Sequence, residues 1–427
     1  FEEHQAAWSE AIFNEDSYFK YLAPLINDNT SAYLSMLQGS KAEQRKWWLY
    51  NRFRYIDSKY NAGDALTDVI TVRGYAKSDI TVTPYADIYA SVKYGSYLTQ
   101  MRALRGNSYT LKCPLDNVND TEIYIYSASQ LKDIGDLSGL KIGYAEFSLA
   151  TKLQAIKVGD ADKSYANPNL TELHLGNNTL LRKLDVRNCP NLTQIPEFIY
   201  DLPELQLLNI ACNKGISGDQ LTADWQRLAD DEDTGPKIQI LYMGYNNLER
   251  FPESASLQKM VKLGLLDCVH NNVKQLEAFG TNVKLTDLKL DYNQIEEIPD
   301  NFCAFTDQVE GLGFSHNKLK YIPNIFNAKS VYVMGSVDFS YNEIGSEGSN
   351  IDCPMAQFKG INASTVTLSY NKITKFPTEL FASGSPISTI DLSNNLMTSI
   401  PENSLKPKEG NYKNTYMLTI IDLRFNK

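Results

Sequence analysis

Hydrophobic residues recur along the C-terminal two thirds of the chain in one pattern, LxxLxLxxNxL, which often closes on isoleucine or phenylalanine followed by proline. Clear copies begin at Leu285, Val309, Ala363 and Ile387; the first of these reads LTDLKLDYNQIEEIP. The alternation LxL predicts a short strand whose leucines face a core while the residues beside them face outward. The asparagine that follows is expected to turn inward, where its amide can satisfy backbone groups left unpaired beyond the strand.

The spacing of these asparagines indicates the architecture. From Asn246 onward they are 25, 22, 24, 25, 29, 24 and 31 residues apart. Most of these steps match the period of leucine-rich repeats, and LRKLDVRNC, from Leu181, fits the same template with Cys189 in the asparagine position, which accepts either residue. Neighbouring turns are expected to pair into one sheet and to bury their apolar sides against each other. The predicted fold class is therefore an α/β solenoid, a leucine-rich-repeat horseshoe with a parallel sheet on its concave face.

The chain before the repeats divides by pattern into three regions. Residues 1–64 carry helical periodicity, whereas residues 65–130 alternate apolar and polar positions between closely spaced turns, as in TEIYIYSA. We therefore expect a helical segment followed by a small antiparallel β-sandwich or barrel-like domain. Residues 131–169 are predicted to form irregular capping turns that close one end of the core. Leucine-rich repeats are expected over residues 170–427, continuing past the C-terminus.

Charge and hydropathy argue against two classes of partner. The chain of 427 residues has 51 acidic and 41 basic residues, giving a formal net charge of −10. This charge opposes electrostatic binding of nucleic acid or anionic lipid over a broad surface. No stretch approaches the apolar length of a membrane helix, so neither nucleic-acid binding nor a transmembrane segment is expected. Aromatic and basic residues interleave in WWLYNRFRYIDSKY, from Trp47. This pattern fits nucleic-acid contact or a packed helix whose cations lie along a core surface. The net negative charge of the chain favours the packed helix.

Motifs for catalysis or metal binding are absent from the sequence. There is no HExxH, GxSxG or Walker loop, and no GxGxxG after a predicted strand. The six cysteines show no CxxC or Cys/His spacing, which favours reduced, mostly buried thiols over a zinc or redox site. We therefore expect no enzymatic activity, no catalytic residues, no metal and no cofactor.

Outward-facing residues of the repeats are the candidate binding residues. The position just before the repeated asparagine carries a ring in successive turns, and charged residues stand beside the strand leucines. Rings at the strand spacing of about 4.8 Å would line the concave rim with a stripe suited to protein hot spots or to sugar stacking. Alternatively, the ring faces simply pack on each other and the charges form a solvated face. The predicted ligand-binding residues of the concave face are Tyr245, His270, Tyr292, His316, Tyr341, Tyr370, Asp267 and Lys289.

Two resemblances bear on function. WWLYNRFRYIDSKYNAGD, ITVTPYADIYASVKYG and NLTELHLGNNTLLRKLDVRNCPNLTQ, all within residues 1–194, resemble a module of gut bacteriophage virion (tail-type) proteins. The repeats after Ile195, with their IP endings, resemble surface leucine-rich-repeat proteins of Bacteroides-type bacteria. The first resemblance implies that residues 1–130 self-associate or bind other virion proteins, and the second implies a bacterial cell surface.

The sequence thus predicts a non-catalytic leucine-rich-repeat recognition protein that works outside the cytoplasm, in the extracellular space or on a bacterial cell surface. Its partner would be a protein or a surface glycan bound by the concave face. The alternative prediction is a tail-associated structural protein of a phage virion whose repeats contact the host surface. Assembly distinguishes the two, because a virion anchor should oligomerise whereas a cell-surface protein should stay monomeric.

Overall fold

The computed structural model describes residues 68–427 except 96, 114, 161–166, 168, 300–301, 303–307, 323–331, 346–362, 379, 381–386 and 406–417. The chain divides into two compact units. Unit 1 takes the chain up to Gly159 together with Asn167–Leu181, and unit 2 takes Asp160–Ala166 and Arg182–Lys427. The predicted helical segment 1–64, which contains the interleaved aromatic and basic residues, lies outside the described residues. The predicted domain boundaries stay predictions.

Unit 1 is built from β-strands. One sheet has the order β10-β8-β1-β6-β3-β4 and a smaller one has the order β5-β2-β7. The pairs that β1, β3, β4, β6 and β8 form among themselves are antiparallel. The buried positions alternate along most of β1 and β6, as expected for strands that cover a core with one face. The strands of unit 1 are β1 (Val69–Gly74), β2 (Ile80–Pro84), β3 (Ile88–Tyr94), β4 (Tyr97–Ala103), β5 (Tyr109–Leu111), β6 (Thr121–Tyr126), β7 (Leu131–Asp133), β8 (Ile142–Glu146), β9 (Ala155–Lys157) and β10 (Glu172–His174).

The first copy of the repeat pattern, LTELHLGNN from Leu170, lies in unit 1. Its strand, β10, pairs in parallel with β8. Asn178 nevertheless behaves like the other repeated asparagines, since its Nδ2 donates to the carbonyls of Phe147 and Ala150, both at 2.9 Å. The turn chemistry of the repeat is therefore present in unit 1 as well.

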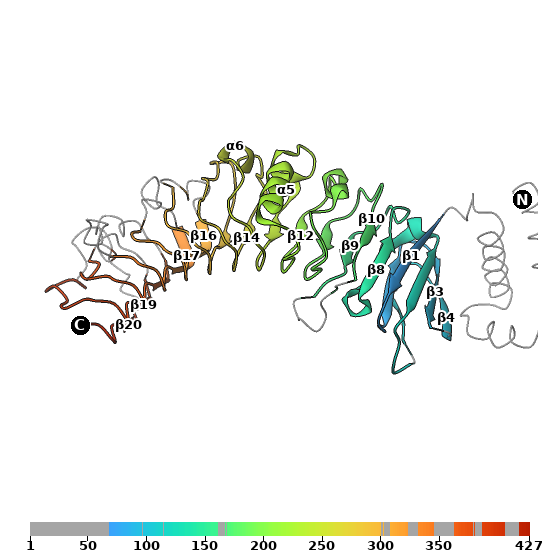
Figure 1. Ribbon diagram of the computed structural model, residues 1–427, viewed down its shortest axis with the longest axis horizontal. Coiled ribbons are helices and arrows are strands. Elements are labelled where there is room, and N and C mark those ends of the chain that lie inside the picture. Colours follow the sequence, from blue (N-terminus) through green and yellow to red (C-terminus); the bar gives the residue numbers. More distant parts are fainter. Residues whose placement is uncertain are drawn as a thin grey trace, which may run out of the picture. The chain divides into compact units, whose positions relative to one another are not determined.

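Unit 2 is a leucine-rich-repeat solenoid, which confirms the predicted fold class. Each strand pairs in parallel with the next one along the chain, so that the sheet grows in sequence order (Figure 1). The strands are β11 (Lys183–Asp185), β12 (Leu207–Asn209), β13 (Ile240–Tyr242), β14 (Leu265–Asp267), β15 (Asp287–Lys289), β16 (Gln308–Gly313), β17 (Tyr332–Asp338), β18 (Thr365–Thr367), β19 (Thr389–Asp391) and β20 (Ile420–Asp422).

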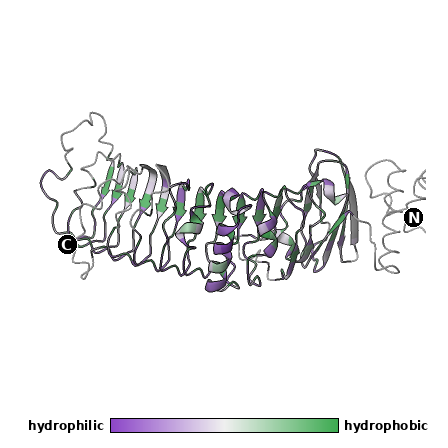
Figure 2. Ribbon diagram, turned by 90° about the horizontal axis from the view of Figure 1, so that it is seen from above, coloured by the Kyte–Doolittle hydropathy of each residue, from purple (hydrophilic) through white to green (hydrophobic). Residues whose placement is uncertain are grey.

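The core of unit 2 is a stack of aligned apolar side chains. Leu266, Leu288 and Leu312 are the middle residues of successive strand cores, are paired in register and are almost completely buried. Figure 2 shows the strands as a row with hydrophobic residues in each. A second column of rings packs edge to face in the core, with centroids 4.7 to 6.2 Å apart, along Trp225, Phe251, Phe279, Phe302 and Phe314.

In the described part of unit 2, two α-helices and two 3₁₀-helices lie between strands. Helix α5 (Gly218–Asp230) begins where the Ser217 side chain accepts a hydrogen bond from the Gln220 N–H, a standard N-cap. Both α5 and α6 (Ser254–Leu257) lie along the upper edge of unit 2 in Figure 1. The short helices are η6 (Glu197–Asp201) and η7 (Gly235–Lys237). Over the parts of the chain that the structure describes, no helix is long and apolar enough to cross a membrane.

Inward-turned asparagines tie each repeat to the next. The Nδ2 of Asn293 donates to the carbonyls of Leu290 in its own turn and Cys268 in the preceding turn, and its Oδ1 accepts from the Val273 N–H, all at 3.0 Å. The side chain is buried, so it satisfies three backbone groups that water cannot reach. The same network recurs at most other repeats, which confirms that the asparagine faces inward; its further members are Asn271, Asn317, Asn342, Asn371, Asn395 and Asn426.

Candidate ligand-binding face

The strands of unit 2 present their first and third residues on the concave face as two rows, because the middle residue points into the core. The first row contains Lys183, Leu207, Ile240, Leu265, Asp287, Gly311, Ser336, Thr365, Thr389 and Ile420. The third-residue row contains Asp185, Asn209, Tyr242, Asp267, Lys289, Gly313, Asp338, Thr367, Asp391 and Asp422. These two rows are called the concave face below.

Three aspartates dominate the third-residue row. In Asp267, Asp338 and Asp391 one carboxylate oxygen accepts the N–H two residues later, at 3.2, 2.8 and 2.9 Å. Burial raises the pKa of Asp267 and Asp338, and the negative charge of Asp291 adds to the rise in both. Lys289 pairs with Asp267 in the sheet register and partly offsets the rise at Asp267. The two predicted strand residues, Asp267 and Lys289, therefore lie side by side on β14 and β15.

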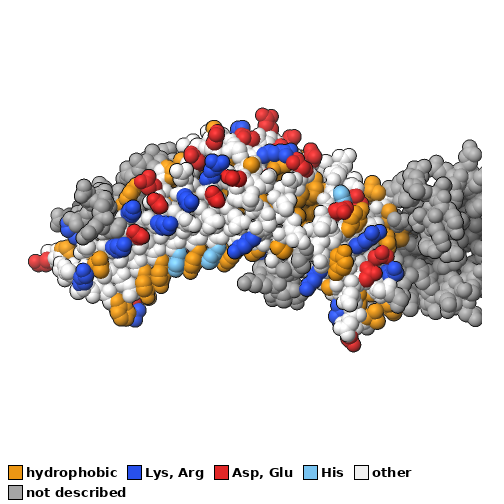
Figure 3. Space-filling model, viewed as in Figure 1, with side chains coloured by type: hydrophobic (Ala, Val, Ile, Leu, Met, Phe, Trp, Pro, Cys, Tyr) orange, Lys and Arg blue, Asp and Glu red, His pale blue; other side chains and the backbone are white. Residues whose placement is uncertain are grey.

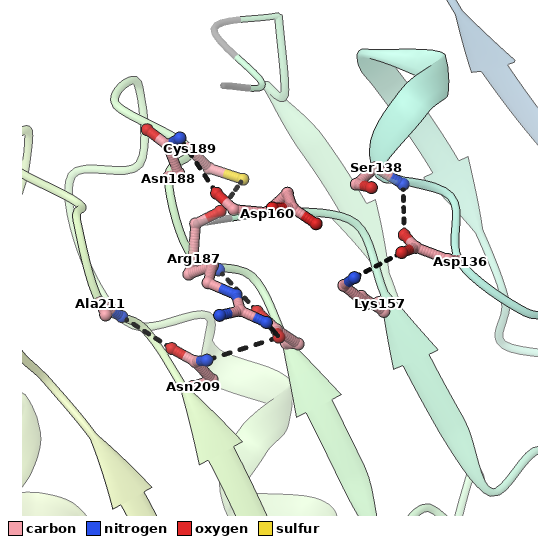
Figure 4. Close-up of polar contacts among 10 residues, drawn as sticks. Asp136, Ser138, Lys157, Asp160, Arg187, Asn188, Cys189, Asn209 and Ala211 are labelled. Atoms are coloured by element: carbon pink, nitrogen blue, oxygen red, sulfur yellow. Dashed lines mark hydrogen bonds and ion pairs between the residues drawn. The ribbon is translucent and has the colours of Figure 1, made fainter. Parts of the chain in front are cut away.

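At both ends of the row the aspartate is neutralised locally. Arg187 forms an ion pair with Asp185 at 2.8 Å, and Arg424 forms one with Asp422 at 2.6 Å. Figure 4 shows Arg187 together with Asn209, whose Nδ2 also donates to Asp185. In each case the arginine stands two residues after the aspartate. At the intervening turns, the corresponding residues are Ala211, Gly244, Val269, Asp291, Ser315, Ser340, Ser369 and Ser393.

The predicted ring residues lie at the edge of the sheet, in the turn beyond each strand. Each has a left-handed backbone, with φ between 53° and 59°, which bulky residues rarely adopt. A backbone hydrogen bond to the next repeat stabilises this turn. For example, the Tyr292 N–H donates to the Ser315 carbonyl at 2.9 Å. Asn188 and Asn394 occupy the same position in other turns with φ 55°. The rings are thus turn residues beside the concave face and not strand residues within it.

The six rings form one continuous stack along this edge, in the order Tyr245, His270, Tyr292, His316, Tyr341, Tyr370. Neighbouring centroids are 4.0 to 4.3 Å apart and neighbouring planes are inclined by 9° to 19°. Figure 3 shows the two histidines of unit 2 among hydrophobic side chains along its lower edge. We call these six residues the ring stack.

Ring faces in the stack are covered. The four tyrosines are 42% to 46% exposed, including the two at the ends of the stack, whereas Phe425 at the same repeat position is 75% exposed. The ring stack therefore offers ring edges, hydroxyl groups and imidazole nitrogens to a ligand. Sugar stacking needs an open ring face, so this geometry favours the alternative in which ring faces pack on each other.

The ring stack makes folding sensitive to pH. Burial lowers the pKa of His270 below its ordinary value of 6.5, and repulsion from His316 lowers it further. At a pH between the folded-state pKa of His270 and 6.5, the unfolded chain binds more protons than the folded chain does. His270 therefore contributes stability that is fully present above pH 6.5 and is lost as the pH falls toward its folded-state pKa. We expect the melting temperature of the full chain to decrease more on acidification than that of His270→Asn, which keeps a side chain suited to the left-handed turn. An equal decrease in melting temperature for the two proteins between neutral pH and about pH 5 would contradict this role of His270.

An apolar corner of the concave face was not among the predicted site residues. Leu207, Ile240 and Leu265 are adjacent in the register of β12, β13 and β14, with Tyr242 in the neighbouring row, and all four are partly exposed. The signal was present in the sequence, because these leucines and isoleucine stand at a repeat position that faces outward. Other repeats carry Asp287, Gly311 or Ser336 at this position. Only the strand register showed that the three apolar residues lie next to one another.

No metal centre emerges from the described residues. Among them, no group of three or more histidine, cysteine, aspartate or glutamate side chains is arranged to hold a metal ion. Cys113, Cys189, Cys212 and Cys268 are free thiols. Burial raises the pKa of Cys189 to about 12 and that of Cys268 well above its ordinary value, so both are protonated and unreactive near neutral pH.

The strand periodicity, the parallel sheet and the asparagine network define the class of the protein as a leucine-rich-repeat protein. No family model matches its sequence. A leucine-rich-repeat protein of Bacteroides thetaiotaomicron is 75% identical in a structural match with a TM-score of 0.56, which covers 66% of this chain and 35% of that one. A leucine-rich-repeat protein of Bacteroides eggerthii is 50% identical, with a TM-score of 0.54 and coverage of 66% and 48%.

Curated relatives match a shorter stretch. Mouse lumican is 32% identical over 170 residues, which is 39% of this chain and 45% of lumican. The chain therefore spans less than half the length of each of these three similar proteins. The comparisons support the resemblance to Bacteroides leucine-rich-repeat proteins, and they do not support the resemblance of residues 1–194 to phage virion proteins.

Proposed function

We propose that this chain is a non-catalytic recognition protein that binds a protein ligand through the concave face and the adjoining ring stack, outside the cytoplasm. The observation that carries the proposal is the concave face itself. It is a parallel sheet whose outward side chains combine an apolar corner, a row of carboxylates and a tyrosine-rich edge. Solenoids of this kind use their extended concave surface for binding.

A protein fits this surface better than a glycan does. Interfaces between proteins are enriched in tyrosine and place apolar residues at their centre, and Tyr242, Ile240 and Leu265 provide such a centre. A sugar would require the open aromatic faces that the ring stack lacks. The location outside the cytoplasm rests on the resemblance to surface leucine-rich-repeat proteins of Bacteroides-type bacteria. The virion alternative stays a prediction, because its resemblance begins within residues 1–67, outside the described residues, and the comparisons do not support it.

Replacing Tyr292 and Tyr341 together by asparagine is expected to weaken binding of the protein ligand at least tenfold. The replacement breaks four of the five ring contacts, which at about 0.5–1.5 kcal/mol each cost about 2–6 kcal/mol in stability. Asparagine suits the left-handed turn, as it does at Asn188 and Asn394. Binding would be measured by surface plasmon resonance against purified secreted and outer-membrane proteins, with a printed glycan array in parallel. Ile240→Asp should also abolish binding, because it places a charge in the apolar corner.

The matched control is Glu232→Gln, an exposed change in the turn after α5 that should leave binding unchanged. Circular dichroism would establish that each variant is folded before its affinity is compared. Binding that survives both Ile240→Asp and the double tyrosine replacement would contradict the proposed surface. Saturable binding to arrayed glycans alone would contradict a protein ligand.

A further inference from the structure

We propose that the concave face from β12 to β19 is the docking surface for an extended, cationic segment of a partner protein. An apolar side chain of this segment would lie on Leu207, Ile240 and Leu265, and its lysine or arginine side chains would pair with Asp267, Asp338 and Asp391. The inference rests on the proposed function, that the concave face binds a protein, and names the chemistry of the partner.

The negative charges of this row are not required by the turn in which they stand. The Oδ1 of Asn209 accepts the N–H of Ala211 at 3.1 Å, in the way that Asp267 accepts the N–H of Val269. A neutral amide therefore makes the same turn in this chain.

Of the three central aspartates of this row, only Asp267 has a neighbouring cation, Lys289 on the next strand, and none has the arginine two residues later that the ends of the row possess. Arg187 and Arg424 neutralise the aspartates two residues before them. At the matching position after Asp267, Asp338 and Asp391 the chain has Val269, Ser340 and Ser393, and among the described residues none of the three aspartates forms an ion pair. Complementary charge from outside the chain would relieve the repulsion that the Asp291 carboxylate exerts on Asp267 and Asp338.

Strand β16 presents neighbouring carboxylates in place of side chains of its own. Both of its outward residues are glycines, Gly311 and Gly313, so the strand between Lys289 and Asp338 carries no side chain on the concave face. A Cβ on Gly313 would approach Asp291 Oδ2 to 2.2 Å, which shows that this carboxylate leans over β16. A Cβ on Gly311 would likewise meet Asp287 Oδ1 at 3.2 Å, so β16 carries two further carboxylates over its outward surface, which adds to the negative charge that a cationic side chain would meet there.

The register predicts the spacing of the cations. Asp267 and Asp338 are three strands apart and Asp338 and Asp391 are two strands apart, or about 14 and 10 Å at the usual strand spacing. An extended segment crossing the strands covers about 3.4 Å per residue and turns every second residue to the same face. A second cation four residues after the first would therefore reach Asp338, and a third cation two residues further on would reach Asp391 if its long side chain spans the remaining distance of about 3 Å. An apolar residue shortly before the first cation would reach the apolar corner on β12 to β14.

The test is fluorescence anisotropy of the full chain with a labelled peptide LSRSASRSR, compared with LSESASESE. We expect the arginine peptide to bind at low salt, to weaken as salt is added, and to lose at least tenfold in affinity against a variant combining Asp267→Asn, Asp338→Asn and Asp391→Asn. Asparagine retains the turn acceptor, so this variant should melt at or above the temperature of the parent chain. The glutamate peptide should not bind.

A second variant separates this surface from general electrostatic attraction. Glu232→Gln, Asp233→Asn and Glu296→Gln remove the same number of charges from exposed positions outside the concave face, and this variant should bind the arginine peptide like the parent. Equal binding by both triple variants, or no binding by the parent, would overturn the inference. If Ile240→Asp abolishes binding of a protein ligand but the variant with all three aspartates replaced by asparagine retains it, the proposed function stands and the inference of a cationic partner is wrong.

Discussion

Replacing Asn293 by alanine is expected to lower the free energy of unfolding by about 2–4 kcal/mol. The asparagine side chain is buried and satisfies the Val273 N–H and the carbonyls of Cys268 and Leu290. Alanine removes these hydrogen bonds and leaves the buried Val273 N–H without its partner, which costs about 1–3 kcal/mol. The two carbonyls each keep one donor, because Cys268 also accepts from Asn271 Nδ2 and Leu290 also accepts from Asn317 Nδ2, so the bonds that they lose add only about 0.5–1.5 kcal/mol.

Urea denaturation followed by circular dichroism would measure this loss. The chain itself supplies an intermediate variant, Asn293→Cys, because Cys189 occupies the equivalent position with a single weak hydrogen bond from Sγ to the Arg187 carbonyl, at 3.5 Å. Its stability should lie between those of the parent and Asn293→Ala. Glu296→Ala, on the exposed side of the same turn, should change stability by less than about 0.5 kcal/mol. A loss below about 1 kcal/mol for Asn293→Ala would show that the network contributes little.

The second large effect is expected from Leu288→Ala, which should destabilise the chain by about 2–5 kcal/mol. Leu288 is 0% exposed at the centre of β15, in register with Leu266 and Leu312. Its loss removes apolar contacts with both neighbouring turns and leaves a cavity, because strands held on both sides cannot move together to fill it. Each repeat packs chiefly against its neighbours, so the damage is expected to be centred on β14, β15 and β16.

Hydrogen exchange measured by mass spectrometry would locate this damage, with protection falling in the peptides that contain these three strands. The controls are Leu288→Met, which conserves volume and should cost less than about 1.5 kcal/mol, and Lys289→Ala, which changes an outward residue of the same strand. Equal destabilisation by Leu288→Ala and Lys289→Ala would contradict the assignment of inward and outward positions.

Prediction from the sequence succeeded where one residue type has one physical role. The leucine spacing predicted the parallel sheet, and the asparagine was correctly expected to turn inward, because an amide is needed to satisfy backbone groups at that point. Prediction was weaker at Leu170, where the same pattern forms β10 of unit 1 beside β8. The local pattern specifies a strand and a turn but not the strand with which they pair.

The candidate site shows the same limit. The sequence placed rings one residue before the asparagine, but it could not show whether a ligand or another ring covers their faces. That depends on the left-handed backbone of Tyr292 and its equivalents, which aligns consecutive side chains at 4.0 to 4.3 Å. The ion pairs of Arg187 and Arg424 with the aspartates two residues earlier were likewise evident only from the side-chain positions.

The sequence by itself determined the leucine-rich-repeat class, the register of strand leucines and inward asparagines, and the candidate rings, since each follows from a local period that burial and backbone hydrogen bonding impose. Only the tertiary structure decided which outward residues become neighbours. Residues such as Ile240 and Leu265, or Asp267 and Lys289, are separated by a whole repeat in the chain and meet through sheet pairing. The binding surface is a property of that pairing, because contacts between repeats join residues that no short stretch of sequence contains together.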